Sequence, residues 1–291
     1  MTGSLLSRFR SAVRGNARAT PTISRAALPD GPDAQRRILV RSEHLCAITD
    51  VGRGKSHNED LVHLSGDGRL MAVADGMGGH ASGQAASALA ILVVSECLQP
   101  LLASSEFPDT GSLESEMRRA MDEAQCRVLA EGRDQAAGEA MGCTMIVACT
   151  RGNTLYTCHV GDVRAYLWKG GELCALTRDH SVVAELVAAG ELTPDQARSH
   201  PAKNEVLQAV GMPDGFEPSM NEAALDPGDR VLLCSDGLWE SLSDHEISAI
   251  VGGEGSMRQI ATQLVDRAND GGGRDNISVL MYEHKAAGAL K

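Results

Sequence analysis

The sequence has few aromatic residues. Of its 291 residues only 3% are Phe, Trp or Tyr, although 43% are hydrophobic. A chain of this length forms one large domain or two small ones, and its hydrophobic content is ample for a sizeable core. Leu, Val, Ile, Ala and Met are therefore expected to fill the interior.

Basic residues are also scarce. The chain has 27 Lys and Arg against 39 Asp and Glu, which gives a net charge of −12. Binding to phosphate backbones needs clustered Lys and Arg, so this balance argues against nucleic acid as the main partner. Acids gathered around a metal ion would account for part of the charge.

Paired cysteines and long apolar runs are missing as well. None of the eight cysteines shows Cys-x-x-Cys spacing. Four lie in apolar, strand-like runs, where cysteine acts as a small hydrophobe: Cys46, Cys149, Cys158 and Cys234. We expect reduced, structural thiols in a cytoplasmic protein, with a disulfide framework or zinc site as the weaker alternative. The longest apolar stretch, around residues 89–94, is far below the roughly 20 residues of a membrane helix, so no membrane span is expected.

Residues 1–43 form a basic N-terminal segment. The part of this segment before Asp30 contains five arginines and no acid, and it is rich in Ser, Ala and Thr. This composition predicts a disordered tail without function. It also resembles an organellar transit peptide, and contact with anionic lipid or an acidic protein is the alternative. Residues 286–291 are expected to form a second, short tail.

Residues 44–285 mix short strands with longer amphipathic segments. Strands are predicted near 45–49, 69–74, 145–150, 154–160, 163–168, 172–176, 230–235 and 277–283, and helices over 82–103, 113–131 and 256–269. Short Gly-containing turns join many of the strands, which favours antiparallel meanders over β-α-β units. Capping boxes at Thr193–Gln196 and Ser243–Glu246 mark two further helix starts. The pattern predicts an α+β domain.

Acidic residues end two apolar runs in the same way. One run ends at Asp75-Gly76 and the other at Asp236-Gly237. A continuously apolar run predicts a buried strand, so an acid at its end enters a cleft. Asp-Gly is also the commonest signal of a tight hairpin turn, and for either pair alone the turn is the stronger interpretation.

Further acids come from distant parts of the chain. Asp275 precedes a strand-like segment, and Glu59 and Asp60 follow a Gly-rich turn. Hard divalent cations take oxygen ligands, so acids gathered at strand ends predict a Mg²⁺ or Mn²⁺ site.

Six motifs occur in a characteristic order. They are Asp50-Val-Gly-Arg-Gly-Lys-Ser-His-Asn-Glu-Asp60, Asp75-Gly-Met-Gly-Gly-His80, Met141-Gly-Cys-Thr144, Gly161-Asp162-Val-Arg164, Ser235-Asp236-Gly237 and Gly273-Arg-Asp275-Asn276. Together they resemble the metal-dependent protein phosphatases, the type 2C serine/threonine class, and its bacterial branch most closely. The match runs from about His44 to Glu283. It implies two stacked antiparallel β-sheets with helices on both outer faces, and a cleft at one end where the acids meet.

The resemblance also implies a chemistry and a set of roles. Phosphoserine and phosphothreonine monoesters would be hydrolysed by water that two Mn²⁺ or Mg²⁺ ions activate, without a covalent nucleophile. Asp75 would bridge the ions, Glu59 and the Gly76 carbonyl would complete one site, and Asp236 and Asp275 the other. Asp60 would act behind these ligands or through water, and Asp162 with Asp236 would hold a third, weaker ion. Taken singly, Asp162 is as well explained as a turn residue and Asp60 as a cap.

Two positions depart from the family pattern. Lys55 stands where the family usually has an arginine that grips the substrate phosphate, so weaker or differently shaped phosphate binding is expected. Nearby Arg53 would compensate, and the alternative for Lys55 is a solvated loop charge. Met77 stands where eukaryotic members have a histidine proposed as general acid. His80, His57 and His180 are the candidate proton donors, although a structural role is favoured for each.

The resemblance also implies roles for Asn276 and for residues 178–215. Asn276 is expected to orient Asp275 or a backbone turn. Residues 178–215 resemble the mobile flap of bacterial members and are expected to border the substrate cleft, although an ordinary loop-helix insert would fit them too.

The sequence therefore predicts a monomeric protein serine/threonine phosphatase. It would act on phosphorylated proteins and oppose a bacterial serine/threonine kinase. The alternative is a pseudophosphatase, a phosphoprotein-binding module with weak or no turnover, for which Lys55 is the one favourable feature. In a scaffolding protein, the third possibility, the acids would be unrelated in space.

Overall fold

The computed structural model describes residues 36–285 except 79, 105–109 and 135–140. The predicted tail up to residue 35 and the short tail at 286–291 lie outside the described residues.

The described strands form two antiparallel sheets. The first has the order β1 (Arg36–Ser42), β2 (Leu45–Asp50), β11 (Ile277–Glu283), β10 (Arg230–Cys234), β7 (Arg164–Lys169), β8 (Glu172–Ala175). The second has the order β3 (Leu61–Leu64), β4 (Leu70–Met77), β5 (Gly142–Arg151), β6 (Thr154–Val160), β9 (Ser219–Ala224). Buried aliphatic side chains from both sheets, such as Val73, Ile146 and Leu233, pack together in one layer between them. Two stacked sheets confirm the predicted core of the fold.

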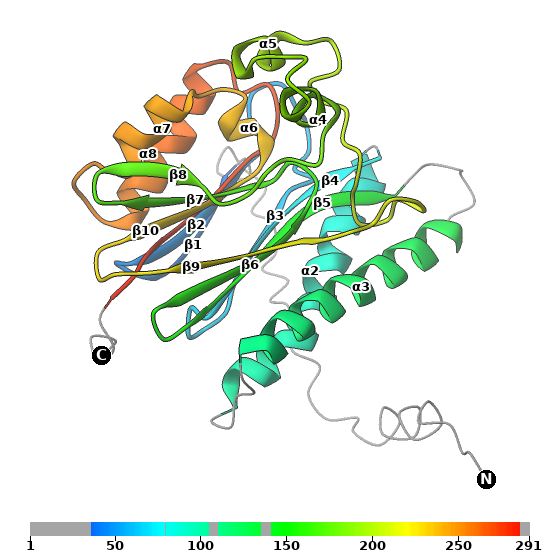
Figure 1. Cartoon of the computed structure of the whole chain (residues 1–291), viewed down its shortest axis with the longest axis horizontal. Helices are drawn as coiled ribbons and strands as arrows, with labels where there is room; N and C mark the ends of the chain where they lie inside the picture. Colours follow the sequence, from blue (N-terminus) through cyan, green and yellow to red (C-terminus); the bar gives the residue numbers. More distant parts are fainter. Residues whose placement is uncertain (1–35, 79, 105–109, 135–140, 286–291) are drawn as a thin grey trace. The chain divides into compact units, whose positions relative to one another are not determined.

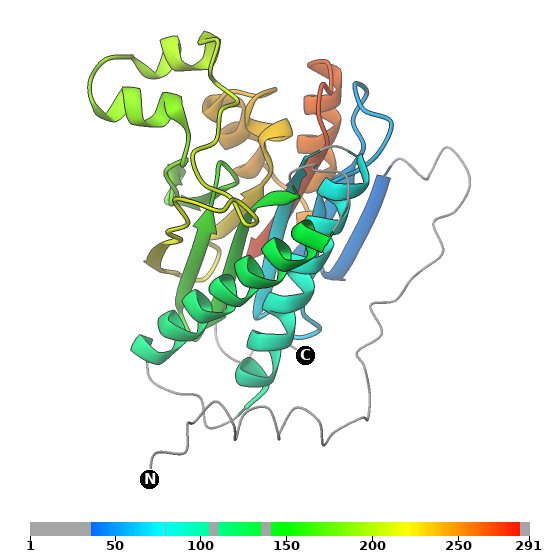
Figure 2. The ribbon, with the colours of Figure 1, turned by 90° about the vertical axis from the view of Figure 1, so that its right-hand side faces the viewer.

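Helices cover both outer faces of this sandwich, as predicted (Figure 1). On the second sheet lie α2 (His80–Ala103) and α3 (Thr110–Asp134), and on the first lie α7 (Asp244–Val251) and α8 (Met257–Asp270). The remaining described helices are α4 (Val182–Ala188), α5 (Pro194–Ser199) and the short α6 (Asp236–Trp239). Figures 1 and 2 both place α4 and α5 beyond one end of the strands.

The sequence of α8 accounts for both its buried face and its starting point. Met257, Ile260, Leu264 and Val265 of α8 recur at helical spacing and are all buried. Ser256 accepts from the backbone N–H of Gln259 in a complete capping box, which fixes where the helix begins.

The helix α2 is apolar on most of its surface. Residues 82–103 have the length and composition of a membrane span, with a mean hydropathy of 1.7. A single helix of this kind among the described residues is weak evidence for a membrane, because core helices of folded domains have the same properties. Here α2 packs between β4 and α3, and 44% of the stretch is buried in the protein.

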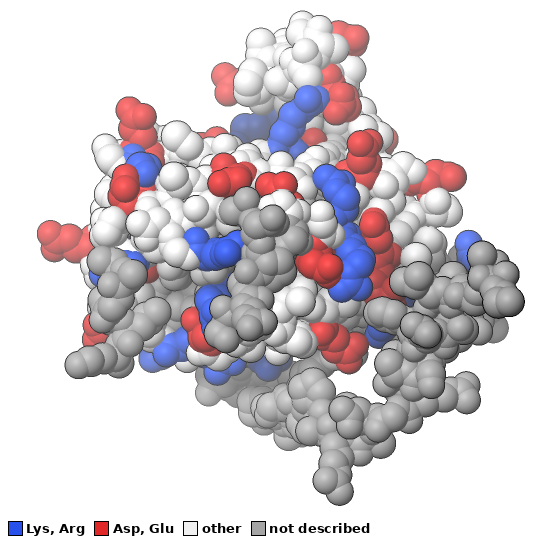
Figure 3. All heavy atoms as spheres, turned by 60° about the horizontal axis from the view of Figure 1, so that its bottom comes forward, with Lys and Arg blue, Asp and Glu red and all other residues white. Residues whose placement is uncertain are grey.

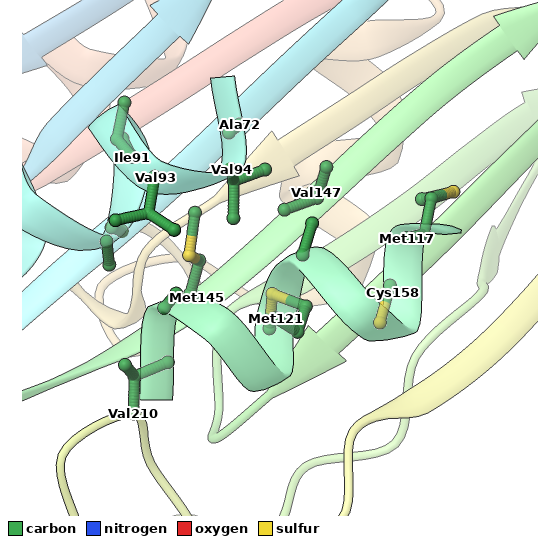
Figure 4. Close-up of a cluster of buried hydrophobic side chains, with 14 of the residues drawn as sticks. Ala72, Ile91, Val93, Val94, Met117, Met121, Met145, Val147, Cys158 and Val210 are labelled. Carbon is green, nitrogen blue, oxygen red and sulfur yellow. The ribbon is translucent and has the colours of Figure 1, made fainter. Parts of the chain in front are cut away.

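Methionines take the place of aromatic side chains beneath α2 and α3. Met117 and Met121 of α3, Met145 of β5, and Val93 and Val94 of α2 belong to one buried cluster, and Figure 4 shows Met121 near Met145 with Met117 farther along α3. Flexible thioether side chains fill irregular gaps well. This agrees with the predicted aliphatic and methionine core.

The strand β1 corrects the predicted boundary of the N-terminal tail. Residues 36–42 pair with β2 and belong to the domain. The arginines around Ile38 and Val40 concealed this strand, because an edge strand can expose such residues; Ile38 is 37% and Val40 45% exposed. The strands β3 and β9 were not predicted either: β3 has four residues, and most of β9 is polar or small.

Acidic and basic side chains are interspersed on the face drawn in Figure 3. Ion pairs occur both between and within elements: Arg127 of α3 lies 3.2 Å from Glu96 of α2 and 2.8 Å from Glu123 of the same helix. On this face the excess of acids is not gathered into one large patch.

Candidate active site

The acids predicted from distant motifs meet at one end of the sandwich. Asp75 ends the apolar part of β4, and Asp60 directly precedes β3, which pairs with β4. Asp236 follows β10 and Asp275 precedes β11, the neighbouring strand of the first sheet. Burial and repulsion from Asp60, Asp236, Asp162 and Asp275 together raise the pKa of Asp75 well above its usual range. The scaffold interpretation, in which the acids are unrelated in space, does not fit this geometry.

Four of these acids, Asp60, Asp75, Asp162 and Asp236, are held in settings that disfavour their charge. Burial raises the pKa of Asp60 to about 6, although the Ser235 hydroxyl donates to its Oδ2 over 2.7 Å. Burial and the neighbouring Asp179 carboxylate raise the pKa of Asp162 to about 7. Burial and the nearby acids also raise the pKa of Asp236. A cation would offset all of these costs at once.

The donor set fits a hard divalent cation. Asp60 Oδ1 and Asp236 Oδ1 are buried and have no hydrogen-bond partner among the described residues, and such orphaned oxygens carry a desolvation cost. Within the same residues no three acidic, His or Cys side chains already surround one point as a finished metal site. Asp275 instead contacts Lys55, and Asp60 contacts Ser235. These carboxylate oxygens would have to turn toward one another to hold a shared cation.

The raised pKa values predict how stability depends on pH in the presence of chelator. Asp60 and Asp162 have folded-state pKa values above the ordinary value of 3.8. Protonation of these two acids therefore contributes to the free energy of unfolding. This contribution is complete below pH 4 and is lost as the pH rises through about 6 and 7. We expect the metal-free protein to melt at a lower temperature at pH 8 than at pH 5.5. Saturating Mn²⁺ should remove or reverse the difference. Identical melting curves with and without Mn²⁺ would contradict a cation site here.

One amide holds the loop between β2 and β3 against the site. Asn276 Oδ1 accepts from the Glu59 N–H over 2.8 Å, and its Nδ2 donates to the carbonyls of Val51 and His57. The Asn276 N–H in turn donates to Asp275 Oδ1 over 2.7 Å. Asn276 thus fixes the backbone that carries Lys55 and Glu59.

The two basic residues of this loop point to different places. Lys55 Nζ lies 2.7 Å from Asp275 Oδ1. Burial lowers the pKa of Lys55, but Asp275, Asp75 and Glu59 outweigh this and raise it overall. Arg53 instead donates from Nε to the carbonyl of Asn269, at the end of α8. The structure therefore brings Lys55 into the acid cluster and ties Arg53 to α8.

Glycine allows α2 to begin beside Glu59. A Cβ at Gly83 would lie 2.1 Å from Glu59 Oε2, and one at Gly76 would lie 2.3 Å from the Gly83 carbonyl oxygen. Any larger residue at either position would push the first turn of α2 away from the end of β4. The sequence signal for this approach is Gly83 itself, a glycine within the predicted helix 82–103.

The three histidines proposed as proton donors lie in different settings. The side chain of His80 lies outside the described residues, and His57 is exposed, with Nδ1 2.8 Å from Ser56 Oγ. His180 stacks on His159, with 4.7 Å between ring centroids. Its Nδ1 accepts from the Gly161 N–H and its Nε2 lies 2.9 Å from Ser219 Oγ. Burial and His159 lower the pKa of His180 to about 4, so this ring is neutral and supports the turn before Asp162.

The predicted flap carries α4 and α5 next to α6. Arg198 donates to the carbonyls of Trp239 and Leu242, and Lys203 Nζ lies 2.7 Å from Glu240 Oε1. A cavity of about 680 Å³ separates these helices from the core. Trp239, one of the residues that line it, donates from Nε1 to the backbone carbonyl of Asp162 over 3.0 Å.

Arg164, the last residue of the Gly161–Arg164 motif, has a structural role that was not predicted from the sequence. Its guanidinium forms two hydrogen bonds with Asp179 at 2.9 and 2.7 Å, and it lies 3.8 Å from the centre of the Trp239 ring. This places Arg164 between the base of the flap and α6. The feature of the sequence that could have indicated this role is the position of Arg164 two residues after Asp162.

Comparison with known proteins shows the family of the chain. The family model described as protein phosphatase 2C matches residues 52–280. The chain belongs to the protein phosphatase 2C family. Protein phosphatase PhpP of Streptococcus pneumoniae is 35% identical over 237 residues, which cover 80% of this chain and 94% of PhpP.

Solved structures of the family share the fold. The serine/threonine phosphatase PstP/Ppp of Mycobacterium tuberculosis has a TM-score of 0.74 and 33% identity, over 86% of this chain and 99% of that one. A PstP catalytic domain solved in complex with two manganese ions has a TM-score of 0.67 and 31% identity, over 85% and 97% of the two chains. The predicted family and fold are confirmed, and the chain is a serine/threonine protein phosphatase of this family.

Proposed function

We propose that this phosphatase hydrolyses phosphoserine and phosphothreonine on proteins with two Mn²⁺ or Mg²⁺ ions as cofactors. The observation that carries the proposal is the convergence of Asp60, Asp75, Asp236 and Asp275 from two sheets, with two buried carboxylate oxygens left unpartnered. The manganese ions of the related PstP catalytic domain support it.

The residues that would hold the ions follow from this placement and from the family resemblance. Asp75 and the Gly76 carbonyl, together with Glu59, would serve one ion, and Asp236 with Asp275 the other. Asp162 would contribute to a third, weaker site. When bound, the ions would lower the pKa of a water molecule and offset negative charge on the phosphoryl oxygens.

The chain's own residues would bind and orient the substrate. Lys55, once released from Asp275, would contact the phosphate with a charge-assisted hydrogen bond. Ser235 would hold Asp60, and Asn276 would keep the Lys55 loop in place. The cavity beside α4, α5 and α6 would receive polypeptide next to the phosphorylated residue, because its lining combines apolar Val183 and Val187 with several charged groups.

The biological setting is part of the proposal. A protein phosphatase requires a kinase that supplies its substrate, so an opposing bacterial serine/threonine kinase is inferred. A cytoplasmic location is inferred from the eight free thiols, of which five are buried, because reducing compartments keep such thiols unpaired.

Phosphate release from a phosphothreonine peptide tests the function directly. We expect turnover with Mn²⁺, slower turnover with Mg²⁺, and none with excess chelator. A folded protein that binds Mn²⁺ but releases no phosphate would favour the pseudophosphatase. The observation in favour of that alternative is the 2.7 Å contact that engages Lys55 with Asp275.

A further inference from the structure

A buried hydroxyl without a partner lies beside the acid cluster. Thr144 of β5 is directly opposite Asp75 in the antiparallel register of β4 and β5. Its side chain is 3% exposed, and its Oγ1 has no hydrogen-bond partner among the described residues. A buried hydroxyl in this state is disfavoured, and such groups call for an explanation.

The register fixes the direction in which Thr144 points. Directly paired residues of antiparallel strands project to the same face, with Cβ atoms about 4.5–5.5 Å apart. Val73 and Ile146, each two residues from one of the pair, lie in the layer between the sheets. Thr144 and Asp75 therefore project together into the end of this layer.

The methyl group of Thr144 is held by packing. A Cβ added to Gly161 would lie 2.3 Å from Thr144 Cγ2, so the methyl rests against the backbone that leads into Asp162. Gly161 has a φ of +93°, which also favours glycine at this position. Cγ2 and Oγ1 are both bonded to Cβ, so a fixed position of the methyl group also fixes the direction in which the Thr144 hydroxyl points.

We propose that Thr144 is a positioning residue whose hydroxyl donates a hydrogen bond to the Asp75 carboxylate when the cations are bound. The bond would hold the Asp75 carboxylate in the orientation needed to serve as a metal ligand. Partners behind a metal ligand that orient it in this way typically contribute about 10–100-fold to metal affinity. A valine would fill the same space without an orphaned hydroxyl, so packing alone does not account for threonine. The inference rests on the proposed metal site.

A second threonine provides a matched control. Thr157 of β6 is 1% exposed and its Oγ1 also has no partner among the described residues. It pairs with Ala148, four residues beyond Thr144 on β5, or about 13 Å along the strand. Thr157 therefore shares the burial of Thr144 but not its place beside Asp75.

The test measures Mn²⁺ affinity by calorimetry and the melting temperature in chelator, for full-length Thr144→Val, Thr144→Ser and Thr157→Val. Thr144→Val should weaken Mn²⁺ binding about 10-fold, while the melting temperature in chelator is unchanged or raised by about 2 °C, because an unsatisfied hydroxyl is removed. Thr157→Val should show the same thermal effect with unchanged Mn²⁺ affinity. Thr144→Ser should keep wild-type affinity despite its lost methyl.

The results separate this inference from the proposed function. Absence of Mn²⁺ binding by the wild type would overturn both. Wild-type affinity in Thr144→Val would overturn the inference alone, as would equal weakening in the serine and valine variants, which would assign the effect to the methyl. If Thr144→Val does not fold, Thr144→Ser is compared with Thr144→Ala, and equal affinities would reject the hydroxyl.

Discussion

Replacing Asp236 with asparagine is expected to lower kcat/KM by about 10³-fold, because several kcal/mol of charge stabilisation depend on the bound ions. Asparagine keeps the shape of the side chain but removes the anionic oxygen. The same change should raise the melting temperature in chelator, because Asp236 is repelled by Asp162 and Asp275 and its Oδ1 is buried without a partner. A gain in stability together with a loss of activity would indicate that Asp236 is a metal ligand whose burial destabilises the metal-free protein.

The measurements are kcat/KM on a phosphothreonine peptide, Mn²⁺ affinity, and melting with and without chelator. Asp226→Asn is the matched control. Asp226 is an exposed acid 2.8 Å from Lys169, at the end of β7 away from the cluster. It should leave activity and Mn²⁺ affinity unchanged. An Asp236→Asn protein that is less stable in chelator and keeps most of its activity would identify Asp236 as a turn residue only.

The acids were predictable because each lies where a strand begins or ends. Leu70–Ala74 and Val231–Cys234 are buried as their continuous apolar pattern predicts, so the residues that follow had to leave the core. The Asp-Gly turn alternative was rejected only by combining motifs. The local apolar pattern predicted that each acid lies at the end of a strand. The resemblance to the phosphatase family predicted that these acids lie together in one site.

The supporting contacts were not predictable, because they join residues far apart in the chain. Asn276 bonds the backbone of Glu59, 217 residues away, and Ser235 bonds Asp60, 175 residues away. No local periodicity encodes such a partner. The capping box at Thr193 likewise predicted the start of α5 correctly, but not the contact of Arg198 with α6.

Replacing Lys55 with methionine is expected to move two observables in opposite directions. Methionine keeps much of the length and removes the charge. Loss of a charge-assisted contact to phosphate should lower kcat/KM about 10–100-fold. Mn²⁺ binding should tighten a few-fold, because the ammonium no longer competes for Asp275 and no longer adds positive charge near Asp75 and Glu59. A residue that only stabilised the loop would weaken both.

The conservative variant separates charge from shape. Lys55→Arg should restore turnover to at least the wild-type level, because a guanidinium grips phosphate with two parallel hydrogen bonds. Lys169→Met is the control: Lys169 pairs with Asp226 and Asp229 and should affect neither observable. Unchanged kinetics and Mn²⁺ affinity in Lys55→Met would make Lys55 a solvated loop charge, even though its side chain is only 44% exposed. The opposite shifts would instead show that one ammonium occupies the acid cluster in the metal-free protein and serves the substrate once metal displaces it.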